Sequence, residues 1–271
     1  MTSVIRDTFE LRAAGRRLVA ERLLPPRAAP GPVLVFLHEG LGSIAQWRDV
    51  PAALCTAAGL PGLVYERWGF GGSEALDAPR TPRYLHDEAL VSLPEVLRGA
   101  GVDDYVLVGH SDGGSIALLH ASSRPAGLRG IVTEAAHVFV EELTLSGIRA
   151  AVQLWQQGDL AARLARYHGD KTAATFAGWA ATWLSADFRA WNIEAELRAI
   201  RCPVFALQGR DDEYGTPAQI AAIARGVAGR VDTWLVPACA HVPHLQARRV
   251  VLRAIAAFVT GLRGGADGHA P

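Results

Sequence analysis

Cysteine is scarce in this sequence: 271 residues contain only three, Cys55, Cys202 and Cys239. Their separations do not match the spacing of metal-binding cysteine pairs, so we expect no bound metal. A low and odd count is typical of proteins kept in a reducing compartment. The cysteine content therefore predicts a cytoplasmic location.

Long apolar runs and net charge are also missing. No stretch reaches the ~18 consecutive apolar residues that a membrane-spanning helix requires. The first residues, MTSVIRD, contain no apolar segment of a secretory signal, and we expect none. Lys and Arg total 27, as do Asp and Glu, so no charge excess points to nucleic acid or an anionic membrane surface. The expected partner is a small molecule, and the sequence does not indicate an oligomeric state.

Hydrophobic residues make up 50% of the chain, and strand patterns alternate with helix patterns. This length and composition suit one large α/β domain, or such a domain with an insertion. Continuous apolar runs predict strands buried on both faces, as in a parallel sheet with helices on either side. We expect a hairpin at 7–13 and 16–23, then strands at 33–37, 63–66, 106–109, 130–133, 203–208 and 231–236.

Helices are expected between these strands. The main predicted segments are 44–58, 84–99, 217–227 and a closing helix that extends to about Arg263. Pro94 should kink or break the second of them, because proline has no N–H to donate. Ligands of such sheets bind beyond the carboxyl ends of the strands. The glycine-rich corners that follow the predicted strands can therefore converge on one site.

Strand patterns disappear between residues 138 and 200, where helical periodicity dominates. This segment holds four of the seven tryptophans, and Phe176, Trp179 and Trp183 share one helical face. We interpret it as a helical cap over the carboxyl-end face. The predicted organisation is a core at 1–137 and 201–263, a cap at 138–200 and a disordered tail at 264–271.

The segment 106–118 carries the main functional motif. An apolar β-branched run leads into Gly-x-Ser-x-Gly, with Ser111 at its centre, and a helix of small residues follows. A serine in this context lies on a strained strand-to-helix turn, with its hydroxyl exposed above the sheet. Side chains at Gly109 and Gly113 would collide with the neighbouring strand and helix. The free N–H groups of the helix point at the turn, where an oxyanion would form.

A serine nucleophile needs a base and a group that orients the base. Asp212 and His241 both follow later predicted strands, and the order Ser, Asp, His is the one expected with a Gly-x-Ser-x-Gly elbow. Asp211 is an alternative acid, and Glu134 a weaker one. We predict a triad of Ser111, Asp212 and His241.

The chain resembles serine hydrolases of the α/β-hydrolase fold, with a carboxylesterase-like pattern and a helical cap. The resemblance covers nearly the whole chain and rests on residues 38–40, 67–73, 109–113, 209–212 and 240–241. It implies an α/β class fold with a mostly parallel eight-stranded sheet flanked by helices. It also implies that neither a metal nor an organic cofactor is required.

The resemblance further implies an oxyanion hole built from two backbone N–H groups. One belongs to Asp112, directly after the nucleophile, and the other to the loop 38–42. Gly40 matches the family position, although Glu39 replaces the customary glycine, and Leu41 is the alternative donor. His38 is expected to brace this loop and His110 to point away from the site, while His244 is expected at the surface or rim.

The leading hypothesis is hydrolysis of carboxylic esters of small apolar or aromatic compounds, through an acyl-enzyme on Ser111. We expect Trp179, Trp183 and Glu39 to contact the substrate. One alternative is a carbon–carbon hydrolase of ring-cleavage products, although His110 and Glu39 stand where such relatives often carry asparagine. Another is a ligand-binding receptor on a hydrolase fold. Thioesters and lactones are further possible substrates, since the fold hosts many reactions.

Overall fold

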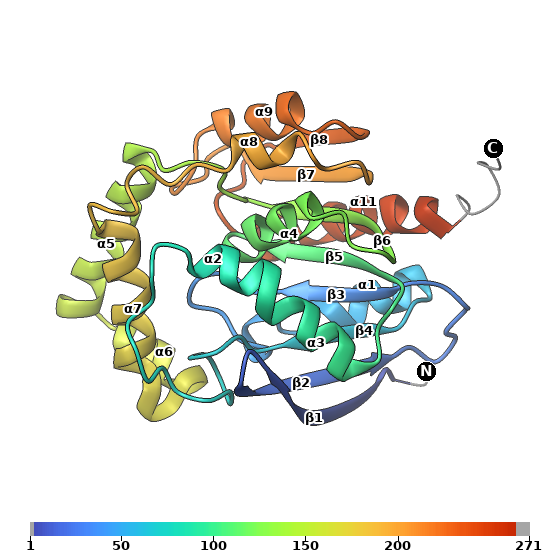
Figure 1. The fold of residues 1–271 in the computed structure, drawn as a ribbon, viewed down its shortest axis with the longest axis horizontal. Coiled ribbons are helices and arrows are strands. Elements are labelled where there is room, and N and C mark those ends of the chain that lie inside the picture. Colours follow the sequence, from blue (N-terminus) through green and yellow to red (C-terminus); the bar gives the residue numbers. More distant parts are fainter. Residues whose placement is uncertain (1–2, 264–271) are drawn as a thin grey trace.

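The computed structural model describes residues 3–263, so the tail predicted at 264–271 lies outside the described residues. These residues form an eight-stranded sheet with the order β1-β2-β4-β3-β5-β6-β7-β8 (Figure 1). β2 is antiparallel to β1 and β4, and all other neighbours are parallel. The strands are β1 Ile5–Ala13, β2 Arg16–Leu24, β3 Val33–Leu37, β4 Gly62–Tyr65, β5 Tyr105–His110, β6 Leu128–Glu134, β7 Val204–Gly209 and β8 Val231–Val236. The predicted mostly parallel eight-stranded sheet is confirmed.

Burial explains why the central strands are apolar runs rather than alternating patterns. Every residue of β4, β5 and β7 is buried. Helices cover both faces, so neither side of these strands reaches water. One core cluster lies between the sheet and two helices, α1 (Val50–Ala58) and α11 (Arg248–Gly261). The other lies between the opposite face and the helices α3 (Leu93–Ala100), α4 (Asp112–Ser122) and α9 (Pro217–Gly226).

The helices follow the strands in the predicted order. They are α1 Val50–Ala58, α2 Tyr84–Asp87, α3 Leu93–Ala100, α4 Asp112–Ser122, α5 Glu142–Gln157, α6 Leu160–His168, α7 Thr172–Leu184, α8 Glu194–Leu197, α9 Pro217–Gly226, α10 Pro243–Gln246 and α11 Arg248–Gly261. Two short 3₁₀ segments, η1 Ala45–Trp47 and η3 Gly169–Lys171, and one π-helical turn, η2 Glu88–Ser92, complete the set.

The prediction of one continuous helix over 44–58 is wrong. The segment is divided into η1 and α1, because Arg48 has a φ of 55° and ends the first turn. α1 then starts with Pro51 in its first turn, where its missing N–H costs no helical hydrogen bond.

The break predicted at Pro94 takes the form of the π-helical turn η2. The N–H of Leu93 donates to the carbonyl of Glu88, five residues earlier, and Pro94 then occupies the first turn of α3. Because that position needs no N–H donor, the chain stays helical on both sides of the proline.

The segment between β6 and β7 contains the helices α5 to α8. In Figure 1, α5, α6 and α7 stand beyond the end of the sheet to which the arrowheads of β3, β5 and β7 point. They therefore lie at the carboxyl ends of the parallel strands. The division into a core and a separate cap with boundaries at 138 and 200 stays a prediction. Within residues 3–263, no helix is long and apolar enough to cross a membrane.

Candidate active site

Ser111 occupies the sharp turn between β5 and α4. Its backbone has φ 52° and ψ −118°, a combination that a residue with a side chain rarely adopts. The flanking glycines allow this turn, as the sequence predicted. A Cβ at Gly109 would lie 2.2 Å from the carbonyl oxygen of Gly113, and one at Gly113 would lie 1.9 Å from that of Leu37. The elbow thus packs directly on β3 and on its own helix.

The structure brings Ser111, His241 and Asp212 together. The hydroxyl of Ser111 lies 3.0 Å from Nε2 of His241, and Nδ1 of His241 lies 2.8 Å from Oδ1 of Asp212. These distances suit a Ser111 hydroxyl that donates to Nε2 of His241, while Nδ1 of the same ring donates to the Asp212 carboxylate. All three residues are buried, with Ser111 only 9% exposed. The three elements that carry them are the β5–α4, β7–α9 and β8–α10 connections.

Asp212 is held in a charged, oriented state. Its Oδ1 also accepts a hydrogen bond from the N–H of Tyr214 (2.8 Å), and its Oδ2 accepts one from Nε2 of Gln208 (3.3 Å). Burial disfavours the carboxylate, but the hydrogen bond and charge of His241 and the Tyr214 N–H outweigh it and lower the pKa of Asp212. The side chain can therefore act as a fixed acceptor for the imidazole.

The two alternative acids do not reach His241. Asp211 is exposed on the same turn. Glu134 is buried, but its Oε2 accepts from Nδ1 and from the backbone N–H of His244, each at 3.1 Å. The expectation that His244 lies at the surface or rim is wrong, because His244 is only 3% exposed. Pairing with the buried Glu134 carboxylate explains its position.

The loop after β3 is held by hydrogen bonds to the backbone carbonyl of Glu39. The carbonyl of Glu39 accepts from Nδ1 of His38 (2.8 Å), Nη2 of Arg67 (2.7 Å) and the N–H of Gly42 (3.1 Å). A trans peptide points its N–H away from its carbonyl, so these donors fix the direction of the Gly40 N–H. Among the described residues, the N–H groups of Gly40, Leu41 and Asp112 have no partner. Both Gly40 and Leu41 remain candidates for the second oxyanion donor.

Sequence reasoning missed the polar network around the Asp112 side chain. Asp112 is 1% exposed, and its Oδ2 accepts a 2.8 Å hydrogen bond from the hydroxyl of Tyr84. The fully buried Arg67 places Nη1 3.6 Å from the same oxygen. No spacing rule connects these three positions in the sequence. The pairing of β3 with β4 and β5 brings Arg67 and Asp112 together, and the packing of α2 on α4 adds Tyr84.

The predicted substrate contacts occupy different environments. Trp179 packs on the loop after β3, since a Cβ at Gly40 would lie 2.4 Å from its Nε1. Trp183 is 2% exposed and donates its Nε1 proton to the hydroxyl of Tyr84 at 2.8 Å, so that donor is already occupied. Contact of either tryptophan with substrate stays a prediction.

Glu39 faces His110 across 3.6 Å, measured from Oε2 to Nδ1. Burial disfavours the charge on each side chain, yet each stabilises the other, so that the pKa of Glu39 is lowered and that of His110 is raised. His110 donates from Nε2 to the backbone carbonyl of His241 at 2.8 Å. It therefore contacts the backbone of the candidate base and makes no hydrogen bond to the reactive groups. Glu39 as a substrate contact stays a prediction.

No cluster of three or more metal-ligating side chains occurs between residues 3 and 263. The geometry instead matches that of a nucleophile, base and acid on a strand-to-helix elbow. A family model described as "Alpha/beta hydrolase family" matches residues 34–254. The chain belongs to the α/β hydrolase family.

Curated relatives of this α/β hydrolase match over part of its length. A 2-succinyl-6-hydroxy-2,4-cyclohexadiene-1-carboxylate synthase from Yersinia enterocolitica is 35% identical over 118 residues, which cover 43% of this chain and 40% of that protein. The synthase of the same name from an Enterobacter species is 37% identical over 109 residues, or 40% of this chain and 39% of that protein. The chain thus matches less than half the length of these relatives.

Solved structures of other α/β hydrolases match nearly the whole chain. The 2-hydroxy-6-oxo-6-phenylhexa-2,4-dienoate hydrolase of Rhodococcus sp. strain RHA1 superimposes with a TM-score of 0.78 at 12% identity, covering 93% of this chain and 98% of that one. The proline iminopeptidase of Mycobacterium smegmatis gives 0.74 at 20% identity, with coverages of 95% and 99%. At these identities the likeness shows a shared fold.

Proposed function

We propose that this α/β hydrolase cleaves carboxylic esters through an acyl-enzyme on Ser111. One observation carries the proposal: the 3.0 Å contact between the Ser111 hydroxyl and Nε2 of His241, whose Nδ1 is held by Asp212. A hydroxyl with a hydrogen-bonded base is the minimum that nucleophilic acyl transfer requires. Asp212 fixes the ring orientation and tautomer that make Nε2 the acceptor.

In the first half-reaction, the oxygen of Ser111 attacks the ester carbonyl and its proton moves to Nε2 of His241. The carbonyl oxygen becomes an oxyanion, which the N–H groups of Asp112 and Gly40 would bind. Three donors hold the Glu39 carbonyl, which fixes the direction of the Gly40 N–H on the other side of the same peptide. This N–H has no partner in the described residues, which supports the assignment. The carbon–oxygen bond to the alcohol then breaks, and His241 returns the proton to the leaving alkoxide.

In the second half-reaction, water attacks the acyl-enzyme carbonyl while Nε2 of His241 accepts a proton from the water. The bond between Ser111 and the acyl carbon breaks, and His241 protonates the serine oxygen. The products are one carboxylic acid and one alcohol, and the free enzyme is restored. The proton transfers between Ser111 and His241 use two atoms that lie 3.0 Å apart.

The expected substrate is a small apolar or aromatic ester. Ser111 and His241 are both less than a tenth exposed, which favours a compact acyl group. The ring of Tyr214 lies 4.7 Å from that of His241, and Trp179 packs against Gly40. Aromatic walls of this kind favour apolar groups next to the scissile bond.

The test is turnover of a panel with purified protein: p-nitrophenyl butyrate, an aryl thioester, an aryl lactone and a vinylogous diketone acid. The proposal predicts fastest turnover of the ester, with kcat of at least ~1 s⁻¹. Turnover far below this value on every ester would contradict the proposal and favour a binding protein on this fold.

A second candidate is reaction at a carbon–carbon bond. It is favoured by the 35% identity to the Yersinia synthase, whose name describes a carbocyclic carboxylate product. Because the match covers only 40% of the synthase, we rank this reaction second to ester hydrolysis. Selective turnover of the vinylogous diketone acid in the same panel would reverse the order.

A further inference from the structure

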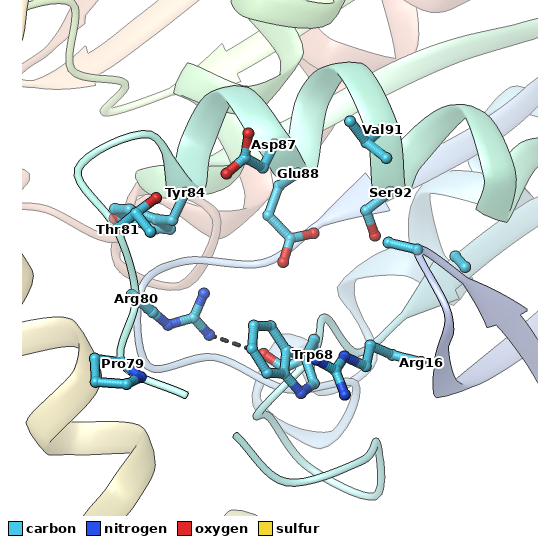
Figure 2. Close-up of a pocket in the computed structure, with 12 residues that line it drawn as sticks. Arg16, Trp68, Pro79, Arg80, Thr81, Tyr84, Asp87, Glu88, Val91 and Ser92 are labelled. Carbon is cyan, nitrogen blue, oxygen red and sulfur yellow. Dashed lines mark hydrogen bonds between the residues drawn. The ribbon is translucent and has the colours of Figure 1, made fainter. Parts of the chain in front are cut away.

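A pocket of about 300 Å³, whose lining does not include Ser111, is shown in Figure 2. It lies between the β1–β2 turn, the loop after β4, the loop before α2, and the helical run from α2 to η2. Its lining residues are Ala13, Ala14, Arg16, Trp68, Pro79, Arg80, Thr81, Tyr84, Asp87, Glu88, Val91 and Ser92. Tyr84 lines the cavity while its hydroxyl bonds Asp112, so Tyr84 stands between the cavity and the elbow.

Glu88 supplies a buried carboxyl group to this cavity. Its side chain extends from η2 toward Trp68 in Figure 2, and the residue is only 5% exposed. Its Oε2 is buried and has no hydrogen-bond partner in the described chain. Burial raises the pKa of Glu88, and the charges of Arg67 and Arg80 offset only part of that rise. A buried carboxylate oxygen without a donor is costly, and a ligand donor would remove that cost.

Arg80 supplies a buried cation to the same pocket. Its Nη2 donates to the carbonyl of Trp68 at 2.8 Å, as the dashed line in Figure 2 marks, but its buried Nε has no partner. The guanidinium stacks over the rings of Phe70 and Tyr84, at 4.7 and 5.3 Å from their centroids. Within residues 3–263, Arg80 makes no ion pair within 4.0 Å. An anionic group in the cavity would complete its bonding.

The remaining lining residues limit the size and polarity of an occupant. Arg16 is already paired with Asp77, so Arg80 is the cation left for a ligand. Trp68, Pro79 and Val91 provide apolar surface beside the two charges. The volume suits a molecule of amino-acid size rather than a peptide or nucleotide.

We propose that this cavity binds a small zwitterion with an apolar side chain, of the α-amino acid class. The ammonium group donates to Glu88, the carboxylate accepts from Arg80, and the side chain packs on Trp68 and Val91. This site is separate from ester hydrolysis and does not depend on it.

The test is isothermal titration calorimetry of the full chain near pH 7 with three probes that share one carbon skeleton. L-Valine carries both charges, isobutylamine lacks the carboxylate, and 3-methylbutanoate lacks the ammonium group. The proposal predicts saturable binding of L-valine in the millimolar range or tighter. Each single-charge probe should bind at least about tenfold more weakly, because one charge-assisted hydrogen bond is lost.

Three variants locate the binding, one in the cavity and two controls outside it. Glu88→Gln removes the acid with little change in shape and should weaken L-valine binding by about tenfold or more. Asp159→Asn removes an exposed carboxylate from the start of α6 and should leave the affinity unchanged. Ser111→Ala should also bind L-valine like the original protein, because the cavity does not include Ser111.

Three outcomes would overturn the proposal: no saturable L-valine binding, equal binding of the three probes, or unchanged binding by a folded Glu88→Gln variant. The comparison of probes on the unsubstituted protein needs no variant to fold. Because calorimetry measures binding alone, its result is independent of whether ester hydrolysis is found.

Discussion

The hydroxyl of Tyr84 donates a 2.8 Å hydrogen bond to Asp112, the residue that follows Ser111. The same hydroxyl accepts a 2.8 Å hydrogen bond from Nε1 of Trp183 in α7. One side chain therefore links the start of α4 to the helices beyond the sheet. Since the N–H of Asp112 is a proposed oxyanion donor, this link ties the geometry of the site to the position of α7.

Replacing Tyr84 with phenylalanine should destabilise the protein by about 1–3 kcal/mol, because the Asp112 carboxylate and the Trp183 N–H both lose a buried partner. Urea unfolding measures this change, and ester turnover should fall in the same variant. Tyr167→Phe is the control, since Tyr167 is exposed on α6. Equal unfolding free energies for the two variants would contradict the structural role of the Tyr84 hydroxyl.

Replacing Asp212 with asparagine should leave the fold intact but lower kcat on the order of 10⁴, by analogy with serine proteases, because His241 loses its oriented acceptor. Asp211→Asn and Glu134→Gln are matched controls, since neither carboxylate contacts His241. Steady-state kinetics on p-nitrophenyl butyrate measures all three. A larger loss in either control than in Asp212→Asn would show that the acid is misassigned.

Gly40→Ala should lower kcat by about 10²–10³, the typical effect of losing one oxyanion donor, because the added methyl displaces the loop that carries the N–H. The added methyl would lie 2.4 Å from Nε1 of Trp179, so either the indole or the loop must move. Gly99→Ala is the control: the nearest atom to its added methyl lies at 3.7 Å, and alanine favours its helix. Because alanine retains the backbone N–H, full kcat in Gly40→Ala would show that the loop has not been displaced, contrary to this prediction.

The stability of Glu88→Gln relative to the unsubstituted protein should increase with pH. Burial raises the pKa of Glu88 above 4.5 in the folded protein. Glu88 therefore adds to the free energy of unfolding below pH 4.5, and this contribution is lost as the pH rises through its folded-state pKa. Glutamine does not titrate and has no such loss. Urea unfolding of both proteins from about pH 4 to about pH 8 tests this, and a stability difference that is constant or falls with pH would contradict it.

The sequence was most informative where one physical requirement dominates a segment. Strands such as β5 and β7 are buried on both faces, so their apolar runs identify them directly. The strand-to-helix turn at Ser111 was equally predictable from the sequence, because only glycine fits at Gly109 and Gly113. These local signals gave the fold and the order of the candidate triad.

Features set by tertiary packing could not be predicted in the same way. The break at Arg48 depends on a backbone conformation that its side chain does not favour. The burial of His244 follows from its pairing with Glu134, which lies 110 positions earlier in the chain. The contact between Tyr84 and Asp112 likewise joins segments that local patterns treat separately. Such pairs become visible only when the strand order is known.

Hydrolysis of p-nitrophenyl butyrate by Ser111→Ala is the most direct test of Ser111 as the nucleophile. Circular dichroism and urea unfolding should first show that the variant is folded. If Ser111 is the nucleophile, kcat should fall on the order of 10⁶, as in serine proteases without their nucleophile. A folded Ser111→Ala variant that hydrolyses the ester at a rate near that of the unsubstituted protein would show that Ser111 is not the nucleophile.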